Sequence, residues 1–105
     1  MDIREIVKNF RVLATTLSST NVGSPERMST LEFLSHVKHS SVTHLANAES
    51  VRAATMSRCV TSLVDDGFVR KLGDKTDGRG VLVAITPKGR NALKKAHAVL
   101  QAGAQ

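Results

Sequence analysis

The feature that most constrains the fold is a change of hydrophobic periodicity at Gly67. Before it, apolar residues recur at steps of three and four, the spacing of one helical face. After it, 68–72 and 81–85 are short runs rich in Val, Leu and Ile, which is typical of strands. The loop 73–80 between them contains Asp77-Gly78, a strong hairpin signal. We therefore predict several helices, then one β-hairpin, then a last helix.

Capping residues mark where the helices begin and end. Ser24-Pro25 and Thr86-Pro87 each combine a capping side chain with proline at the first helical position. Asp2 stands where its carboxylate can cap a first helix, and the helix that begins at Pro25 is expected to fade at His39. Two further helices are predicted over 42–48 and 53–66, the second ended by Gly67 with the apolar Phe68 after it. The inward faces are predicted to carry Met28, Leu31, Leu34, Val37, Leu45, Ala46, Met56, Cys59, Val60, Leu63, Leu93, Ala96 and Leu100.

The N-terminal helix carries a regular apolar stripe of about five turns. A stripe of this kind is buried either against its own domain or against a partner chain. We favour the partner and predict a homodimer. The residues assigned to dimerisation are Ile3, Ile6, Val7, Phe10, Leu13 and Leu17.

Positive charge is concentrated in the second half of the chain. The 105 residues carry a formal net charge of +6. Acidic and basic residues are equal in number over residues 1–51, so the whole positive excess lies after Val51. A one-sided positive field suits a polyanion, most simply nucleic acid, although a solvated surface explains charge alone equally well. The single cysteine cannot form a disulfide within the chain, and the N-terminus is amphipathic and does not resemble a secretory signal. We therefore predict a cytoplasmic protein.

The order of elements indicates one mainly α domain with a small β-hairpin, a winged helix-turn-helix. We assign 1–105 to a single domain, with 1–20 as the N-terminal helix and 24–101 as the DNA-binding core. The wing is placed at 68–86. In this architecture the second helix of the pair, here 53–66, enters the major groove, and the wing loop 73–80 can reach the minor groove.

Two stretches resemble the MarR family of bacterial regulators. The first runs from Leu45-Ala46 through Val51–Arg58 to Leu63–Val69 and is common to many helix-turn-helix proteins. The second, Asp74–Arg79 followed by Val81–Arg90, resembles the family's wing and the start of the next helix, and is more specific. The resemblance, over about residues 27–95, implies double-stranded DNA as partner, repression, a dimer and a small-molecule effector.

The expected contacts divide by chemistry. Arg58 is placed to bond a guanine edge, and the small Ala53 and Ala54 allow close approach. Hydroxyl and lysine side chains are expected to position the protein on phosphates. The resemblance implies that Arg79 enters the minor groove and that Asp77 orients it. The full predicted DNA-binding set is Thr43, Arg52, Ala53, Ala54, Thr55, Ser57, Arg58, Thr61, Lys71, Lys75, Asp77 and Arg79.

Other chemistries find less support. Cys59 falls among apolar neighbours, so we interpret it as a small buried hydrophobe and not as a redox sensor. His36, His39 and His44 are near one another but lack further ligands at zinc spacing. No catalytic residue set stands out, so we predict no enzyme, metal or cofactor. The alternative function is a winged helix that modulates another regulator through protein contacts, which Arg52 and Arg58 oppose.

Overall fold

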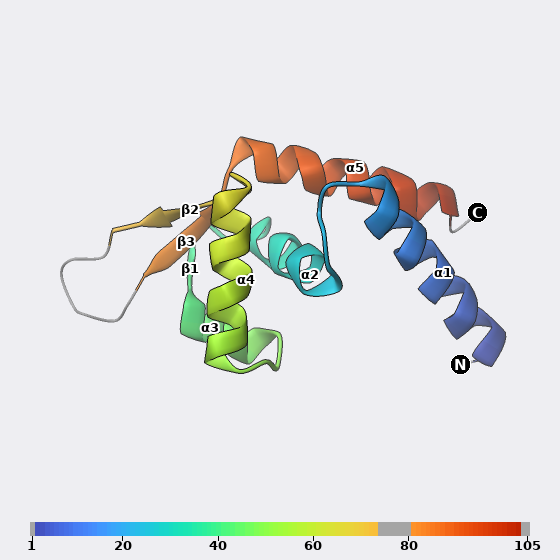
Figure 1. Ribbon diagram of the computed structural model, residues 1–105, viewed down its shortest axis with the longest axis horizontal. Coiled ribbons are helices and arrows are strands. Elements are labelled where there is room, and N and C mark those ends of the chain that lie inside the picture. Colours follow the sequence, from blue (N-terminus) through green and yellow to red (C-terminus); the bar gives the residue numbers. More distant parts are fainter. Residues whose placement is uncertain (1, 74–80, 104–105) are drawn as a thin grey trace.

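The computed structural model describes residues 2–73 and 81–103. This part of the chain forms five helices and a small three-stranded antiparallel sheet, which lies at one side of the molecule (Figure 1). The elements, in order, are α1 Ile3–Ser19, α2 Pro25–Leu34, β1 Ser40–Ser41, α3 Val42–Ala48, α4 Ala53–Asp65, β2 Val69–Leu72, β3 Leu82–Ile85 and α5 Pro87–Gly103. The predicted winged helix-turn-helix class is confirmed. None of the described helices is long and apolar enough to cross a membrane.

The predicted caps form as the sequence indicates. The Asp2 carboxylate accepts the Arg4 amide at 2.9 Å, and the Ser24 hydroxyl accepts the Arg27 amide at 3.2 Å. Thr86 accepts the Gly89 amide at 3.0 Å at the start of α5. Each bond satisfies an amide that the first helical turn leaves without a backbone partner.

Gly67 ends α4 in the left-handed conformation, with φ of 78°. The Phe68 amide donates to the Leu63 carbonyl and the Gly67 amide to the Val64 carbonyl, both at 2.9 Å. These two bonds form a Schellman motif, which turns the chain sharply from α4 into β2. The Thr86 hydroxyl donates to the Gly67 carbonyl at 2.6 Å, so the start of α5 is tied to the same corner.

The sheet contains a strand that sequence analysis missed. We expected Ser40 and Ser41 to be the fading end of a helix, whereas α2 ends at Leu34 and these two serines pair with Val83 and Leu82 of β3. A two-residue strand has no periodicity of its own, because its pairing depends on a partner distant in sequence. β3 therefore lies between β1 and β2, in the order β1-β3-β2.

The core lies where α2, α3, α4 and the sheet meet. Leu31, Leu34, Leu45 and Leu63 are fully buried there, as the sequence predicts. Cys59, Val37 and Leu100 are only partly buried and pack against the edge of this cluster. α1 packs along α5 on the side of the molecule away from α3 and α4 (Figure 1). The fold thus separates the helix-turn-helix from the terminal helices.

Candidate nucleic-acid interface

The α4 side chains expected to contact DNA share one exposed surface. The helix is amphipathic, with Met56, Val60 and Leu63 buried on its inner side. Thr55 is half-buried, and the exposed members of the predicted set on α4 and at its N-cap are Arg52, Ala53, Ala54, Ser57, Arg58 and Thr61. The structure therefore places this part of the set together on the outer side of one helix.

The remaining predicted contacts come from other elements. Thr43 is exposed in the first turn of α3, and Lys71 is exposed on β2. Lys75, Asp77 and Arg79 lie outside the described residues. The wing tip therefore stays a prediction from the sequence.

The N-terminus of α4 differs from those of α2 and α3. Ser24 caps α2 and Ser41 caps α3 through their hydroxyl groups. Arg52 is the N-cap of α4, and no side chain of the described part of the chain hydrogen-bonds there. The first-turn amides of α4 thus keep donors that a phosphate oxygen can accept, and the helix dipole favours an anion at that end.

A strained turn directs α4. Ser50 has a φ of 56°, in the left-handed region that non-glycine residues rarely occupy. The Val51 amide donates to the Ala46 carbonyl at 3.0 Å and the Ser50 amide to the Asn47 carbonyl at 3.2 Å. This is a second Schellman motif, and it sets the angle between α3 and α4. Ser50 therefore helps to determine where the exposed surface of α4 points.

Arg27 holds the other end of α4, and sequence analysis missed it. Its guanidinium donates to the Val22 carbonyl and the Asp66 carboxylate, both at 2.6 Å, and also to the Ser62 hydroxyl. The side chain is only 12% exposed, and its guanidinium lies 5.5 Å from the centre of the Phe68 ring. Arg27 thus joins the α1–α2 connection to the C-terminus of α4. One arginine in the first turn of a short helix gives no sequence signal of such a role.

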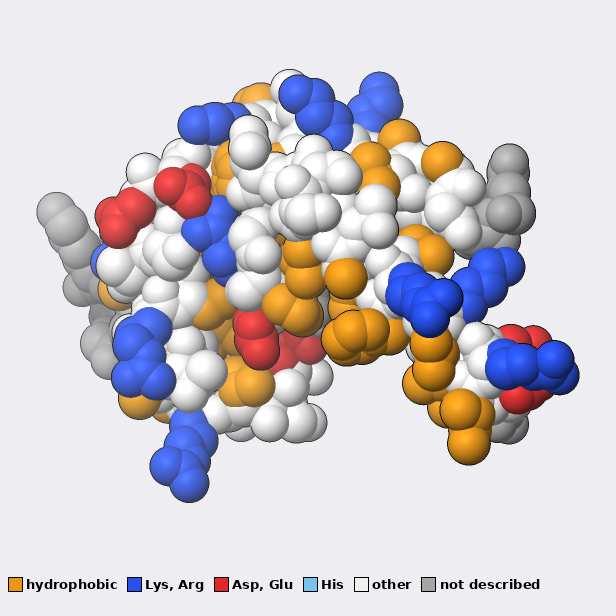
Figure 2. Space-filling view, turned by 45° about the vertical axis from the view of Figure 1, so that its right-hand side comes forward, with side chains coloured by type: hydrophobic (Ala, Val, Ile, Leu, Met, Phe, Trp, Pro, Cys, Tyr) orange, Lys and Arg blue, Asp and Glu red, His pale blue; other side chains and the backbone are white. Residues whose placement is uncertain are grey.

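The α1 stripe divides into two parts. Leu13 and Leu17 are partly buried and pack against the core of their own chain. Ile3 and Phe10 are 74% and 70% exposed, and Ile6 and Val7 are also exposed. Figure 2 shows hydrophobic side chains along this projecting arm, beside the hollow that separates it from the rest of the molecule. The N-terminal half of the stripe is thus left uncovered.

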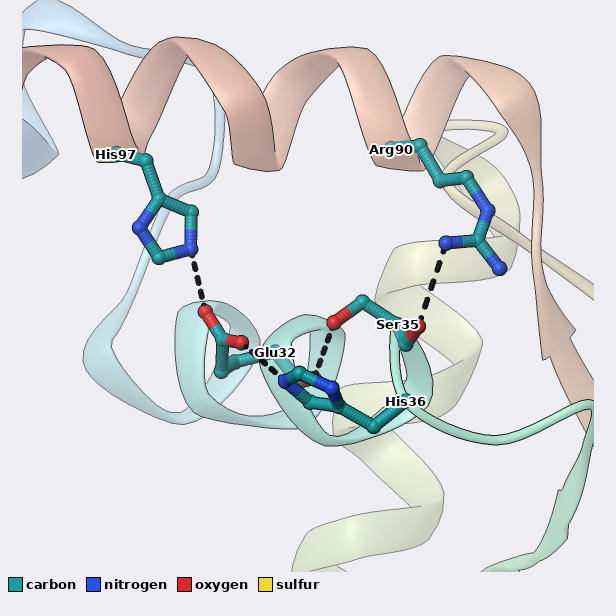
Figure 3. A network of polar contacts seen from close by, with 5 residues as sticks. All are labelled: Glu32, Ser35, His36, Arg90 and His97. Atoms are coloured by element: carbon teal, nitrogen blue, oxygen red, sulfur yellow. Dashed lines mark hydrogen bonds and ion pairs between the residues drawn. The ribbon is translucent and has the colours of Figure 1, made fainter.

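The histidines form a polar link between α2 and α5. Glu32 contacts His36 at 2.8 Å with one carboxylate oxygen and His97 at 2.5 Å with the other (Figure 3). Burial raises the pKa of Glu32, but the bonds and charges of the two imidazoles outweigh it, so the pKa is lowered overall. His44 instead lies against the Phe33 ring, 5.7 Å between centroids. Among the described residues, no group of three metal-ligating side chains is arranged to hold a metal ion.

Cys59 is a half-buried thiol in contact with α2. The Thr30 hydroxyl lies 3.8 Å from its sulfur. Burial raises the pKa of the thiol above its usual value, and nearby Glu26 and Glu49 act in the same direction. A raised pKa keeps the thiol protonated, which is unlike the activated thiolate of a reactive cysteine.

Comparison with known proteins agrees with this geometry. The MarR family model matches residues 24–81, which is more than half of the chain. An uncharacterized HTH-type transcriptional regulator of Mycobacterium leprae is 35% identical over an alignment of 92 residues, and the match covers 85% of this chain. The chain spans 64% of the length of that relative.

Two solved structures are similar over most of the chain. A mutant MarR from E. coli, crystallised with operator DNA, has a TM-score of 0.77 at 26% identity, covering 89% of this chain and 66% of that one. The YusO protein from Bacillus subtilis has a TM-score of 0.83 at 15% identity, covering 94% and 70%, and supports the fold alone. On the family match, together with the winged helix-turn-helix and its exposed α4, this chain belongs to the MarR family.

Proposed function

We propose that this chain is a transcriptional regulator that binds double-stranded DNA, with α4 in the major groove and the wing at 73–80 in the adjacent minor groove. The observation that carries the proposal is the exposed outer side of α4 with its N-terminus free of a side-chain cap. E. coli MarR, 26% identical to this chain, has been crystallised with operator DNA. Because chromosomal DNA would be its partner, the proposal keeps the cytoplasmic location that the sequence analysis predicts.

The side chains of this surface fit distinct parts of a duplex. Arg58 has the length and the planar donors to bond a guanine edge, while Ala53 and Ala54 allow the helix to approach the base edges closely. Ser57 and Thr43 suit phosphate oxygens, as do the amides at the start of α4. Lys71 adds positive charge from β2. The contacts to base edges select a sequence, and the contacts to phosphates fix the helix in the groove.

We propose further that the working form is a homodimer. Ile3, Ile6, Val7 and Phe10 form an exposed apolar surface on α1, and both termini lie at the end of the molecule away from α3 and α4 (Figure 1). A second copy packed there would leave both α4 helices free. A two-fold dimer spaces its recognition helices by about 34–36 Å, one turn of DNA, and so reads an inverted repeat. We propose repression as the outcome, because a dimer bound to such a site within a promoter would exclude RNA polymerase.

Binding to labelled duplexes tests the proposal. We would compare DNA from the gene's own upstream region with a scrambled duplex of equal length, across a salt series. The proposal expects tighter binding to the upstream duplex and a steep loss of affinity with salt, since each phosphate contact releases counterions. Failure to bind either duplex at low salt would reject DNA binding and favour a module that modulates another regulator through protein contacts.

Sedimentation of the wild type and of Phe10→Ser tests the dimer. Phe10 is 70% exposed, so its replacement should leave the monomer folded while weakening association. Lys8→Ser, an exposed change on the same helix, is the matched control. A wild type that stays monomeric at high concentration would contradict the homodimer.

A further inference from the structure

Arg27 is a largely buried cation that the proposed DNA contacts do not use. Its side chain is only 12% exposed, and arginine is rarely buried unless it is paired. Each of its three guanidinium nitrogens has a partner of its own. Nε donates to the Val22 carbonyl at 2.6 Å, Nη1 to the Ser62 hydroxyl at 2.5 Å and Nη2 to the Asp66 carboxylate at 2.6 Å. The planar fork of a guanidinium suits this three-way arrangement, whereas a lysine ammonium lacks it.

The three partners belong to two separate parts of the fold. Val22 lies in the connection that follows α1, whereas Ser62 and Asp66 lie in the last turn and at the C-cap of α4. α1 packs chiefly along α5, and α4 packs against α2, α3 and β2. The orientation of α1 relative to α4 therefore depends on intermediates. Arg27 is one of them, because its side chain bonds directly to both parts.

The chain on each side of the guanidinium is fitted to it. Gly23 has a φ of 102°, and a Cβ at this position would lie 2.9 Å from Arg27 Nε, closer than real Cβ atoms approach. The Val22 side chain is fully buried, which holds its carbonyl in place. The Phe68 ring, just after α4, has its centre 5.5 Å from the guanidinium. A different angle between the α1–α2 connection and α4 would break these contacts.

We infer that Arg27 is a positioning residue, which fixes the angle between α1 and α4. α4 has 13 residues and is therefore about 20 Å long. A rotation of about 10° at its C-terminus moves its N-terminus by about 3.5 Å, roughly one base-pair step. In a dimer joined through α1, such a displacement misaligns the second half-site, so Arg27 determines the half-site spacing that the protein prefers. The role in spacing rests on the proposed function, whereas the role in the angle does not.

Residual dipolar couplings of the backbone amides, measured on the whole chain without DNA, test the angle. We expect α1 and α4 of the wild type to fit one alignment tensor, and those of Arg27→Gln to require two. Arg27→Lys should behave like Arg27→Gln, because one ammonium group cannot reproduce the three-way geometry. Asp66→Ala is the milder variant, since the Asp66 side chain is 52% exposed, and should change the angle less but in the same direction.

Leu93→Val is the control for a merely structural role. It shortens a buried side chain of α5 and lowers stability through a small cavity, but it removes none of the hydrogen bonds of Arg27. We expect it to leave the angle unchanged. A loss of stability without a change of angle in Arg27→Gln would mean that Arg27 only stabilises the fold.

Binding to DNA tests the spacing. The duplexes are the site located by footprinting in the gene's upstream region and two versions with one base pair inserted or deleted at its centre. We expect either change to weaken the wild type about fivefold or more, which is the lower value of one bidentate base contact. Arg27→Gln should be weakened by a smaller factor, and Leu93→Val should keep the preference of the wild type.

Four results would overturn the inference. These are a wild-type angle in Arg27→Gln, a wild-type angle in Arg27→Lys, an unchanged spacing preference in Arg27→Gln, or an equal change of angle in Leu93→Val. The two proposals fail separately. A chain that binds no DNA loses the proposed function, while the couplings still decide the angle. A chain that binds DNA, with angle and spacing preference unchanged in Arg27→Gln, loses this inference alone.

Discussion

Replacing Gly89 by alanine tests the packing that joins the wing to the last helix. A Cβ at this position would lie 2.1 Å from the Phe68 carbonyl oxygen and 2.9 Å from Ile85 Cγ1. The first contact is with backbone and cannot be relieved by a rotamer change, so α5 or the start of β2 must move. Overpacking of this kind costs about 3 kcal/mol, at the upper end of the usual range.

The same substitution also has a favourable term. Alanine is better than glycine within a helix by up to about 1 kcal/mol, and Gly89 lies in the first turn of α5. The net expected loss is therefore about 2 kcal/mol, or a Tm lower by about 8–16 °C for a domain of this size. Thermal and urea unfolding at one protein concentration would measure it.

Gly73→Ala is the matched control. Within the described part of the chain, its Cβ would meet no atom within 4 Å, so unfolding should change by less than about 0.5 kcal/mol. A Gly89→Ala protein as stable as the wild type, or more stable, would refute the packing argument, because the cost of the close contacts would then be no larger than the gain in helix propensity.

Two further predictions concern the α3–α4 turn and the α2–α5 link. Ser50→Gly should raise stability by about 1 kcal/mol, since glycine adopts the observed φ of 56° without a Cβ penalty; an unchanged or lower urea midpoint would contradict the strained turn. Burial raises the pKa of the Glu32 carboxyl, but its bonds to His36 and His97 lower that pKa overall. The ionised carboxylate therefore stabilises the fold at pH values above its pKa in the unfolded chain. This contribution is lost as the pH falls through the lower pKa of the folded protein. Glu32→Gln should therefore lose stability near neutral pH and show a smaller further loss on acidification than the wild type; parallel stability profiles against pH would contradict the link.

The sequence could predict those parts of the fold that depend on local chemistry. The caps at Ser24 and Thr86 and the left-handed Gly67 follow from what each residue type does next to a helix end. The buried leucines followed from helical spacing. The exposed surface of α4 followed as well, because it is the side opposite Met56, Val60 and Leu63.

Features that depend on distant partners could not be predicted in this way. β1 exists because β3 pairs with it, and Arg27 reaches Asp66, 39 residues away in sequence. The α1 stripe is a mixed case. Its periodicity predicts burial for every member, whereas the fold buries only its C-terminal part, because α1 extends beyond the region where α5 covers it. Local pattern identifies an apolar face but not its partner.

The most direct test of DNA reading by α4 is the ratio of affinities for the upstream duplex and a scrambled one, measured for the wild type, Arg58→Ala and Lys71→Ala. The account predicts that Arg58→Ala lowers the ratio by about 5- to 150-fold, which corresponds to about 1–3 kcal/mol for a bidentate base contact. Lys71→Ala should weaken both duplexes alike and leave the ratio unchanged. Equal effects of the two substitutions on the ratio would contradict the assignment of base reading to α4.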